Sequence, residues 1–189
     1  PQAATRLDQL DAATLPDQGQ LAGRWVRWCE LGRVAPYEGS NVATTVGGIT
    51  PRLADVAGFY RAFGMAVSGD RPDHIVAQLE FLALVLLAEA EAIERGDPER
   101  SQIAADATRS FLRDHVGVWI YAWAARVGEI DELAPWFPYA AAAADLTRSE
   151  AANRNVIPLC DGVALPADAG VADDADAVIE CGDEGDSPD

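Results

Sequence analysis

An acid and an imidazole stand side by side at Asp73 and His74, directly after Pro72 and ahead of a long apolar segment. Such a pair can exchange protons as a general acid and base, or it can bind a cationic group of a partner. It can equally begin a helix, with the Asp73 carboxylate capping the free N–H groups of the first turn and His74 inside that turn. Adjacent helical side chains point in different directions and rarely share a proton. We therefore expect helix capping or recognition here rather than catalysis.

Other residues that could perform chemistry are few. His115 is the second of two histidines, and the sequence contains no nucleophile-elbow, zinc-protease, phosphate-loop or dinucleotide-binding motif. The three cysteines, Cys29, Cys160 and Cys181, match neither a disulfide framework nor a CxxC metal site, and we expect one buried thiol and two tail thiols. The sequence therefore predicts a protein that is not an enzyme, with no catalytic residue, no metal site and no cofactor.

The charge of the chain restricts its partners. The net charge is −17, and all fourteen cationic side chains are arginine. Nucleic acid is not expected as a partner, because neutralising phosphates requires a basic surface; an acidic surface favours a basic partner segment instead. The sequence shows no apolar run long enough to cross a membrane and no secretory signal, so we expect a cytoplasmic protein without an integral membrane segment.

Helix signals recur along the chain, whereas strand signals are nearly absent. The expected helical segments are residues 21–30, 50–63, 73–95, 97–128 and 140–146, with a loop at 33–48. The 73–95 segment is apolar almost all round, which is typical of a central helix. The sequence thus predicts an all-α, single-domain bundle of six or seven helices over residues 1–158. Residues 159–189 are rich in Asp, Ala and Gly and are expected to form an acidic, poorly ordered tail.

The order of the motifs resembles that of one protein family. The loop motif PYEGS at 36–40 precedes Tyr60, the PDH motif at 72–74, the LEF motif at 79–81 and an aromatic helix that contains Trp119. This order and spacing are similar to those of the TorD/DmsD/NarJ family of redox-enzyme maturation chaperones, which also proofread twin-arginine export. The resemblance covers about residues 21 to 145. The stretch before the loop is shorter than the family usually has, so an N-terminal helix is expected to be missing or shortened.

The resemblance implies a TorD-like, all-helical cytoplasmic chaperone. Such a protein binds the twin-arginine leader peptide, the apo form, or both, of a molybdopterin-containing oxidoreductase catalytic subunit until cofactor insertion, before export or membrane assembly. The positions that match the family's leader- and client-binding motifs are Pro36, Tyr37, Glu38, Ser40, Pro72, Asp73 and His74. The positions expected to support the structure or a binding groove are Tyr60, Glu80, Phe81 and Trp119.

A binding mechanism follows from this chemistry as a hypothesis. Asp73 or Glu38 would pair an arginine of the leader in a bidentate way, and Tyr37 and His74 would form the groove wall. Gln78 stands where the family has an acid, so that acid's role does not transfer to this chain. Two alternatives stay open: an assembly factor for a subunit without an exported leader, and an all-helical ligand-binding or interaction domain with no molybdoenzyme client. Monomer and homodimer are both open as well.

Overall fold

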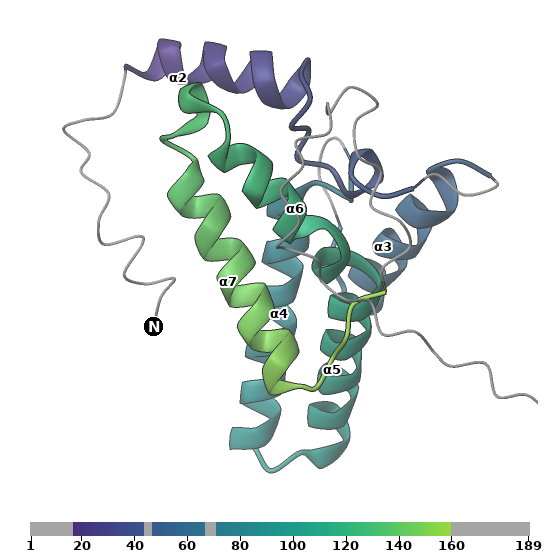
Figure 1. Ribbon diagram of the computed structural model, residues 1–189. Coiled ribbons are helices and arrows are strands. Elements are labelled where there is room, and N and C mark those ends of the chain that lie inside the picture. Colours follow the sequence, from purple (N-terminus) through teal and green to yellow (C-terminus); the bar gives the residue numbers. More distant parts are fainter. Residues whose placement is uncertain (1–16, 44–46, 67–70, 160–189) are drawn as a thin grey trace, which may run out of the picture.

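The computed structural model describes residues 17–43, 47–66 and 71–159, and in these residues the regular secondary structure consists of helices joined by loops and turns (Figure 1). The α-helices are α2 (Gln18–Trp25), α3 (Thr50–Ala62), α4 (Ile75–Glu94), α5 (Pro98–Phe111), α6 (Gly117–Gly128) and α7 (Phe137–Asn153). Within the described residues, the only strand-like pairing is one isolated antiparallel bridge between Tyr37 and His74. The predicted all-α bundle is confirmed. Residues 160–189, with Cys160 and Cys181, and the N-terminal residues 1–16 lie outside the described part.

The helices form two packed pairs with a crossing helix at one end. Helix α4 packs against α5, and α6 packs against α7, while α2 lies across the end where α6 turns into α7 (Figure 1). The contact between Trp25 and Trp136, with ring centroids 5.8 Å apart, helps to attach α2 to that end. No helix in residues 17–43, 47–66 and 71–159 is long and apolar enough to cross a membrane.

The segment predicted as one long helix at 97–128 contains an interruption. Asp97 caps its start by accepting from the Arg100 N–H group at 3.1 Å. The helix then widens into a π-turn, Leu112–Val116, which joins α5 to α6. Gly117 follows the π-turn, and a Cβ atom there would lie 2.2 Å from the Leu112 carbonyl oxygen. Glycine is therefore required at this junction. His115 lies within the π-turn and is buried.

An aromatic cluster forms the centre of the bundle. Phe81 of α4 and Phe111 of α5 are fully buried, with ring centroids 4.6 Å apart. Phe59 and Tyr60 of α3 contact both rings. These four rings pack together at the centre of the core, with Phe81 among them.

Helix α4 is less enclosed than its composition predicts. Phe81, Leu82 and Val85 face the core, but Val76, Leu84, Leu87 and Ile93 are between 48% and 63% exposed. The expectation that α4 is buried on nearly all faces is therefore wrong for the described part of the chain. The reason is the layout of the bundle, in which α5 covers one side of α4 and the described helices leave another side open.

Cys29 is the buried thiol that the sequence predicts. It lies at 0% exposure in the π-turn Val26–Glu30, and burial, with a smaller contribution from the Glu30 charge, raises the pKa of the thiol to about 12. Because the thiolate is the reactive form, we expect iodoacetamide at about pH 8 to leave Cys29 unmodified in the folded protein. Peptide mass spectrometry measures this directly, with urea-unfolded protein as the control in which Cys29 must react. Rapid modification of Cys29 in the folded protein would contradict the burial.

Candidate functional site

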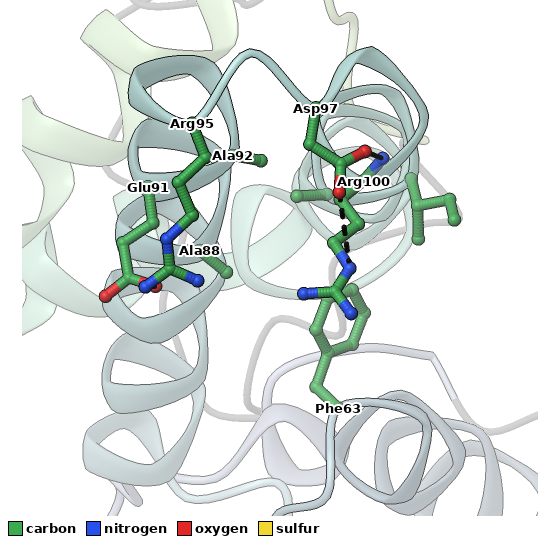
Figure 2. Close-up of a pocket in the computed structure, with 9 residues that line it drawn as sticks. Phe63, Ala88, Glu91, Ala92, Arg95, Asp97 and Arg100 are labelled. Atoms are coloured by element: carbon green, nitrogen blue, oxygen red, sulfur yellow. Dashed lines mark hydrogen bonds and ion pairs between the residues drawn. The ribbon is translucent and has the colours of Figure 1, made fainter.

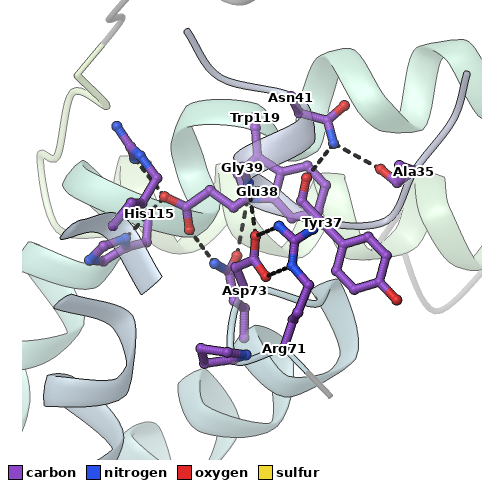
Figure 3. Close-up of polar contacts among 12 residues, drawn as sticks. Ala35, Tyr37, Glu38, Gly39, Asn41, Arg71, Asp73, His115 and Trp119 are labelled. Atoms are coloured by element: carbon purple, nitrogen blue, oxygen red, sulfur yellow. Dashed lines mark hydrogen bonds and ion pairs between the residues drawn. The ribbon is translucent and has the colours of Figure 1, made fainter. Parts of the chain in front are cut away.

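Two motifs that are distant in sequence meet through backbone hydrogen bonds. The Glu38 N–H group donates to the Asp73 carbonyl oxygen, and the Ile75 N–H group donates to the Pro36 carbonyl oxygen, both at 2.9 Å. These bonds flank the bridge between Tyr37 and His74. The loop at 36–40 and the turn at 71–74 therefore form one unit (Figure 3).

Asp73 holds this unit together from the inside. Its carboxylate is fully buried and accepts two hydrogen bonds from the Arg71 guanidinium, at 2.9 and 2.5 Å. It also accepts from the Gly39 N–H group at 2.9 Å, which links it to the loop. A Cβ atom at Gly39 would lie 1.8 Å from the end of the Ile49 side chain, so a larger residue there would require Ile49 to move.

The prediction that Asp73 caps the long helix is wrong. The cap residue is His74, whose extended backbone precedes α4 and whose Nδ1 atom accepts from the Val76 N–H group at 3.1 Å. Asp73 does not reach the helix, because its carboxylate is engaged by Arg71 and Gly39. As expected for adjacent residues, the Asp73 and His74 side chains have separate partners.

Glu38 is the centre of a buried polar network. Its carboxylate is fully buried and accepts from Arg52 at 2.6 Å, from the Gln78 amide, and from His115 Nδ1 at 3.1 Å. Trp119 donates its indole N–H to the Gln78 amide oxygen at 3.0 Å. We call these five residues the Glu38 network. It ties the loop to α3, α4, the π-turn and α6 (Figure 3).

Gln78 suits this network for a chemical reason. An amide both donates and accepts, so Gln78 can donate to Glu38 and accept from Trp119 at the same time. An acid at this position would place a second carboxylate against Glu38 inside the protein, where two like charges repel strongly. Gln78 departs from the family pattern, which has an acid here, and its uncharged amide avoids this repulsion with Glu38.

A pocket of about 430 Å³ opens beside the joined motifs, and we call it the Tyr37 pocket. Its polar wall consists of Tyr37, His74, Arg71, Glu30 and Glu80. The Tyr37 ring meets the His74 ring edge to face at 5.1 Å, and the Arg71 guanidinium lies over the Tyr37 ring at 4.5 Å. The Tyr37 hydroxyl reaches Glu30 at 3.4 Å. The remaining lining residues are Tyr60, Met65, Ala66, Val76 and Ala77.

The other predicted site residues occupy different places. Pro36 is buried behind the loop, and Ser40 is exposed but does not line the Tyr37 pocket. The Pro72 carbonyl oxygen accepts from the Tyr60 hydroxyl at 2.7 Å. Burial, with the charges of Glu38, Asp73 and Glu80, raises the pKa of Tyr60, which therefore keeps the proton that it donates. Trp119 is fully buried within the Glu38 network.

The distribution of charge defines what the Tyr37 pocket can bind. The two carboxylates that the sequence hypothesis assigns to a partner's arginine, Asp73 and Glu38, each pair with an arginine of this chain. The exposed carboxylates at the pocket are Glu30 and Glu80. Two exposed acids beside aromatic rings suit a cationic group. Within the described residues, no group of three or more His, Cys, Asp or Glu side chains could hold a metal ion.

Sequence patterns alone do not indicate four residues of the Glu38 network and the Tyr37 pocket: Arg71, Arg52, Gln78 and Glu30. Arg71 had a weak local signal, since it lies two residues before Asp73 in the same turn. Arg52 and Gln78 lack such a signal, because their partner Glu38 is distant in sequence. Glu30 was assigned to a helix end, and its place at the Tyr37 pocket depends on how α2 and its π-turn approach the loop.

A separate hollow of about 240 Å³ lies between α4 and α5 near the turn that joins them (Figure 2). Arg95 and Arg100 line it, and each pairs with an acid of its own helix end: Arg95 with Glu91 at 3.4 Å and Arg100 with Asp97 at 3.5 Å. None of the predicted site residues lines this hollow. Its charges are compensated locally, so we do not consider it the functional site.

In this all-helical protein, the loop and the PDH turn together form one pocket lined by acidic and aromatic side chains. Residues 3–125 match the family described as "Nitrate reductase delta subunit", and this match covers more than half of the chain. The chain belongs to this family. The resemblance to the NarJ-containing chaperone family is therefore confirmed.

Two curated relatives are similar over part of the chain. The "Selenate reductase assembly chaperone protein" of Thauera selenatis is 35% identical over 102 residues, which are 52% of this chain and 50% of that protein. The "Chlorate reductase assembly chaperone protein" of Ideonella dechloratans is 38% identical over 88 residues, 44% of this chain and 43% of that protein. The chain thus spans about half the length, or less, of these relatives. No solved structure matches the chain.

Proposed function

We propose that this protein is an assembly chaperone that binds the catalytic subunit of a molybdopterin-containing oxidoreductase until its cofactor is inserted. The observation that carries this proposal is the family match over residues 3–125. The names of the two curated relatives, both assembly chaperones of reductases, support it and favour a binding protein over an enzyme. The chaperone would act in the cytoplasm, before export or membrane assembly of the subunit.

The Tyr37 pocket is the proposed contact for a basic segment of this client. Glu30 and Glu80 would pair an arginine, and the Tyr37 and His74 rings would stack on its guanidinium. Asp73 and Glu38 would act indirectly, because each is fully buried and pairs with an arginine of the chain itself. They hold the loop and the turn in the positions that shape the pocket.

The basic segment can belong to a twin-arginine leader or to the mature apo-subunit. A leader has a cationic front and an apolar middle, and the pocket offers acids next to Met65, Val76 and Ala77. Binding of a synthetic leader peptide, compared with binding of the leaderless subunit, separates the two cases. Light scattering of the purified protein distinguishes the monomer from the homodimer that the sequence leaves open.

Affinity purification from the native host tests the proposed function. The tagged full chain is recovered under conditions in which molybdoenzymes are expressed, and its partners are identified by mass spectrometry. We expect one oxidoreductase catalytic subunit, present without its cofactor. Recovery of no such subunit would reject the chaperone proposal and favour a helical interaction domain with another partner.

Replacing His74 with asparagine separates helix capping from recognition. Asparagine is a good N-cap residue, so His74→Asn should keep the stability of α4 within about 0.5 kcal/mol. It removes the ring that contacts Tyr37, so client binding should weaken roughly fivefold, or about 1 kcal/mol. Calorimetric titration with the client segment measures the affinity, and urea denaturation measures the stability.

The matched control is Asp97→Asn, which exchanges one good cap for another at the start of α5, away from the Tyr37 pocket. It should leave both affinity and stability unchanged. If His74→Asn also leaves client affinity unchanged, His74 serves as a cap alone and the Tyr37 pocket loses one wall of its proposed binding site.

A further inference from the structure

The loop has an extended stretch at residues 35–38, which we call the loop strand, and only one of its edges faces the PDH turn. Tyr37 lies at φ −123° and ψ 133°, so successive carbonyl groups point to opposite sides. The Pro36 carbonyl and the Glu38 N–H group pair with the turn. The carbonyls of Ala35 and Tyr37 therefore face the opposite edge, where they require other donors.

One buried side chain supplies both donors. Asn41 follows the short 3₁₀ turn Glu38–Ser40, which brings it back beside the loop strand, and it is 2% exposed. Its amide nitrogen donates to the Ala35 carbonyl oxygen at 2.8 Å and to the Tyr37 carbonyl oxygen at 2.6 Å (Figure 3). Because an amide nitrogen carries two N–H groups, Asn41 takes the place of a neighbouring strand at this edge.

Helix α6 holds the other end of the Asn41 amide. The Arg126 guanidinium donates to Asn41 Oδ1. A guanidinium only donates and a backbone carbonyl only accepts, so the three partners together determine which end of the amide is nitrogen. Rotating the amide by half a turn would break all three hydrogen bonds. Arg126 therefore orients Asn41 toward the loop strand.

Arg126 is poorly placed to contribute stability. Burial lowers the pKa of its guanidinium, and the charge of Glu129 raises this pKa by a smaller amount. Its Nε atom is buried and has no hydrogen-bond partner in the described part of the chain. Desolvation of a cation that is bonded to a neutral amide opposes the gain from that bond. The distinct effect of the contact is thus the orientation of the Asn41 amide.

The same face of α6 also holds the residue that precedes the loop strand. Trp123 donates its indole N–H to the Val34 carbonyl oxygen at 3.2 Å. Trp123 and Arg126 are three residues apart, so their side chains lie on one face of the helix. Helix α6 therefore contacts the loop at Val34 and at Asn41, while the PDH turn pairs with the other edge of the loop strand.

We propose that Asn41 and Arg126 are positioning residues of the Tyr37 pocket. Arg126 orients the Asn41 amide, and the amide holds the Tyr37 backbone from the edge opposite the PDH turn. The Tyr37 ring is thereby kept against His74 and Arg71, with which it forms the pocket wall. Neither Asn41 nor Arg126 lines the pocket, so both act through Tyr37. The consequence for client binding rests on the proposed function, whereas the consequence for the loop does not.

Hydrogen exchange of single amides tests the positioning on the full chain. The reporters are the N–H groups of Glu38 and Ile75, which join the loop to the turn. Asn41→Asp keeps the side chain's size and its acceptor for Arg126, but it presents only acceptors to the two carbonyls. Both reporters should exchange roughly tenfold faster. This rise must exceed that of the Val85 amide in the core of α4, which follows the stability of the whole protein.

Substitutions of Arg126 test the orientation of the amide, and they decide the proposal if Asn41→Asp does not fold. Arg126→Met keeps the apolar stem and removes the donors, so both reporters should exchange about threefold faster. Arg126→Lys keeps a cationic donor and should hold the rates within about twofold of the wild type. The control for charge is Asn153→Asp, which adds the same charge at the exposed end of α7 and should change neither reporter.

A peptide titration connects the positioning with the Tyr37 pocket. The probe is acetyl-Ala-Arg-Arg-Leu-Ala-amide, and calorimetry measures its affinity. Asn41→Asp adds a negative charge to the loop, which by itself favours a cationic peptide. We nevertheless expect this variant to bind the peptide about fivefold more weakly, because the Tyr37 ring is no longer held in place. A loss of affinity against the direction of the charge change reports geometry rather than electrostatics.

Four results would overturn the proposal. These are unchanged exchange of both reporters in Asn41→Asp, a rise no larger than that of the Val85 amide, equal rates in Arg126→Met and Arg126→Lys, and unchanged peptide affinity in Asn41→Asp. If the wild-type protein does not bind the peptide, the proposed contact of the Tyr37 pocket with a basic segment fails. The exchange rates then decide by themselves whether Asn41 and Arg126 position the loop.

Discussion

Replacing Glu38 with alanine is expected to lower the free energy of unfolding by about 3–5 kcal/mol, because it breaks a buried ion pair by removing one partner. The Glu38 carboxylate is fully buried and is the shared acceptor of Arg52, Gln78 and His115. Without it, three donors inside the protein lose their acceptor together. The loop at 36–40 also loses its side-chain connection to α3, α4 and the π-turn.

Urea denaturation followed by circular dichroism measures this effect. The control is Glu80→Ala, since Glu80 is an exposed glutamate at the Tyr37 pocket and its removal should change stability by no more than about 0.5 kcal/mol. Glu80→Ala should weaken client binding instead, whereas Glu38→Ala should affect stability first. A loss below about 1 kcal/mol for Glu38→Ala would mean that water readily replaces the carboxylate, and the Glu38 network would then not hold the loop.

Replacing Phe81 with alanine is expected to cost about 3–5 kcal/mol of stability, the usual range for removing a fully buried phenylalanine. Phe81 is at 0% exposure, and its ring lies 4.6 Å from Phe111, 5.1 Å from Tyr60 and 5.7 Å from Phe63, measured between centroids. Tyr60 and Phe111 come from α3 and α5, and Phe63 directly follows α3, so the substitution leaves a cavity where three helices meet.

The matched control is Leu87→Ala on the same helix. Leu87 is 63% exposed, so its truncation should change stability by no more than about 0.5 kcal/mol. Thermal and urea unfolding of both variants give the comparison. If both substitutions lowered stability by similar amounts, the exposed side of α4 that contains Leu87 would have to be covered in solution. The described helices would then not account for the burial of Leu87.

The helices that the sequence predicts well are those with local signals. Asp97 and Pro98 mark the start of α5, because a capping carboxylate and a proline in the first turn act within a few residues. The apolar stripe of α4 predicts its inner face in part: Ile75 and Leu82 are buried, whereas Ile93 at the other end is 63% exposed. For α3, Pro51 marks the first turn, although the cap position is Ile49 and lacks a side-chain hydrogen bond.

The π-turn shows the limit of periodicity. Phe111, His115 and Trp119 follow each other at four-residue steps, which fits an uninterrupted helix. The widening at Leu112–Val116 inserts a different hydrogen-bond pattern, and its visible sign is Gly117 next to the Leu112 carbonyl oxygen. A lone glycine inside a helical pattern has several readings, so the pattern could not predict that His115 turns inward to Glu38.

The candidate site divides in the same way. The types and order of its residues, from Tyr37 and Glu38 to Asp73 and His74, were sufficient to indicate the family, because motifs are properties of the chain's order. The sequence was not sufficient to predict the roles of these residues, since the pairing of side chains depends on which of them meet across the fold. Asp73 meets Arg71 rather than a helix end, and Glu38 meets Arg52 rather than solvent.

Helix content, an apolar core face and an acidic, lysine-free composition follow from the sequence, because each depends on neighbours along the chain or on simple sums over it. The burial of the two motif carboxylates, and the exposure of Glu30 and Glu80 at the Tyr37 pocket, depend on contacts between distant segments. Such contacts form only when the helices pack, and packing determines which charges lie inside and which are available to a partner.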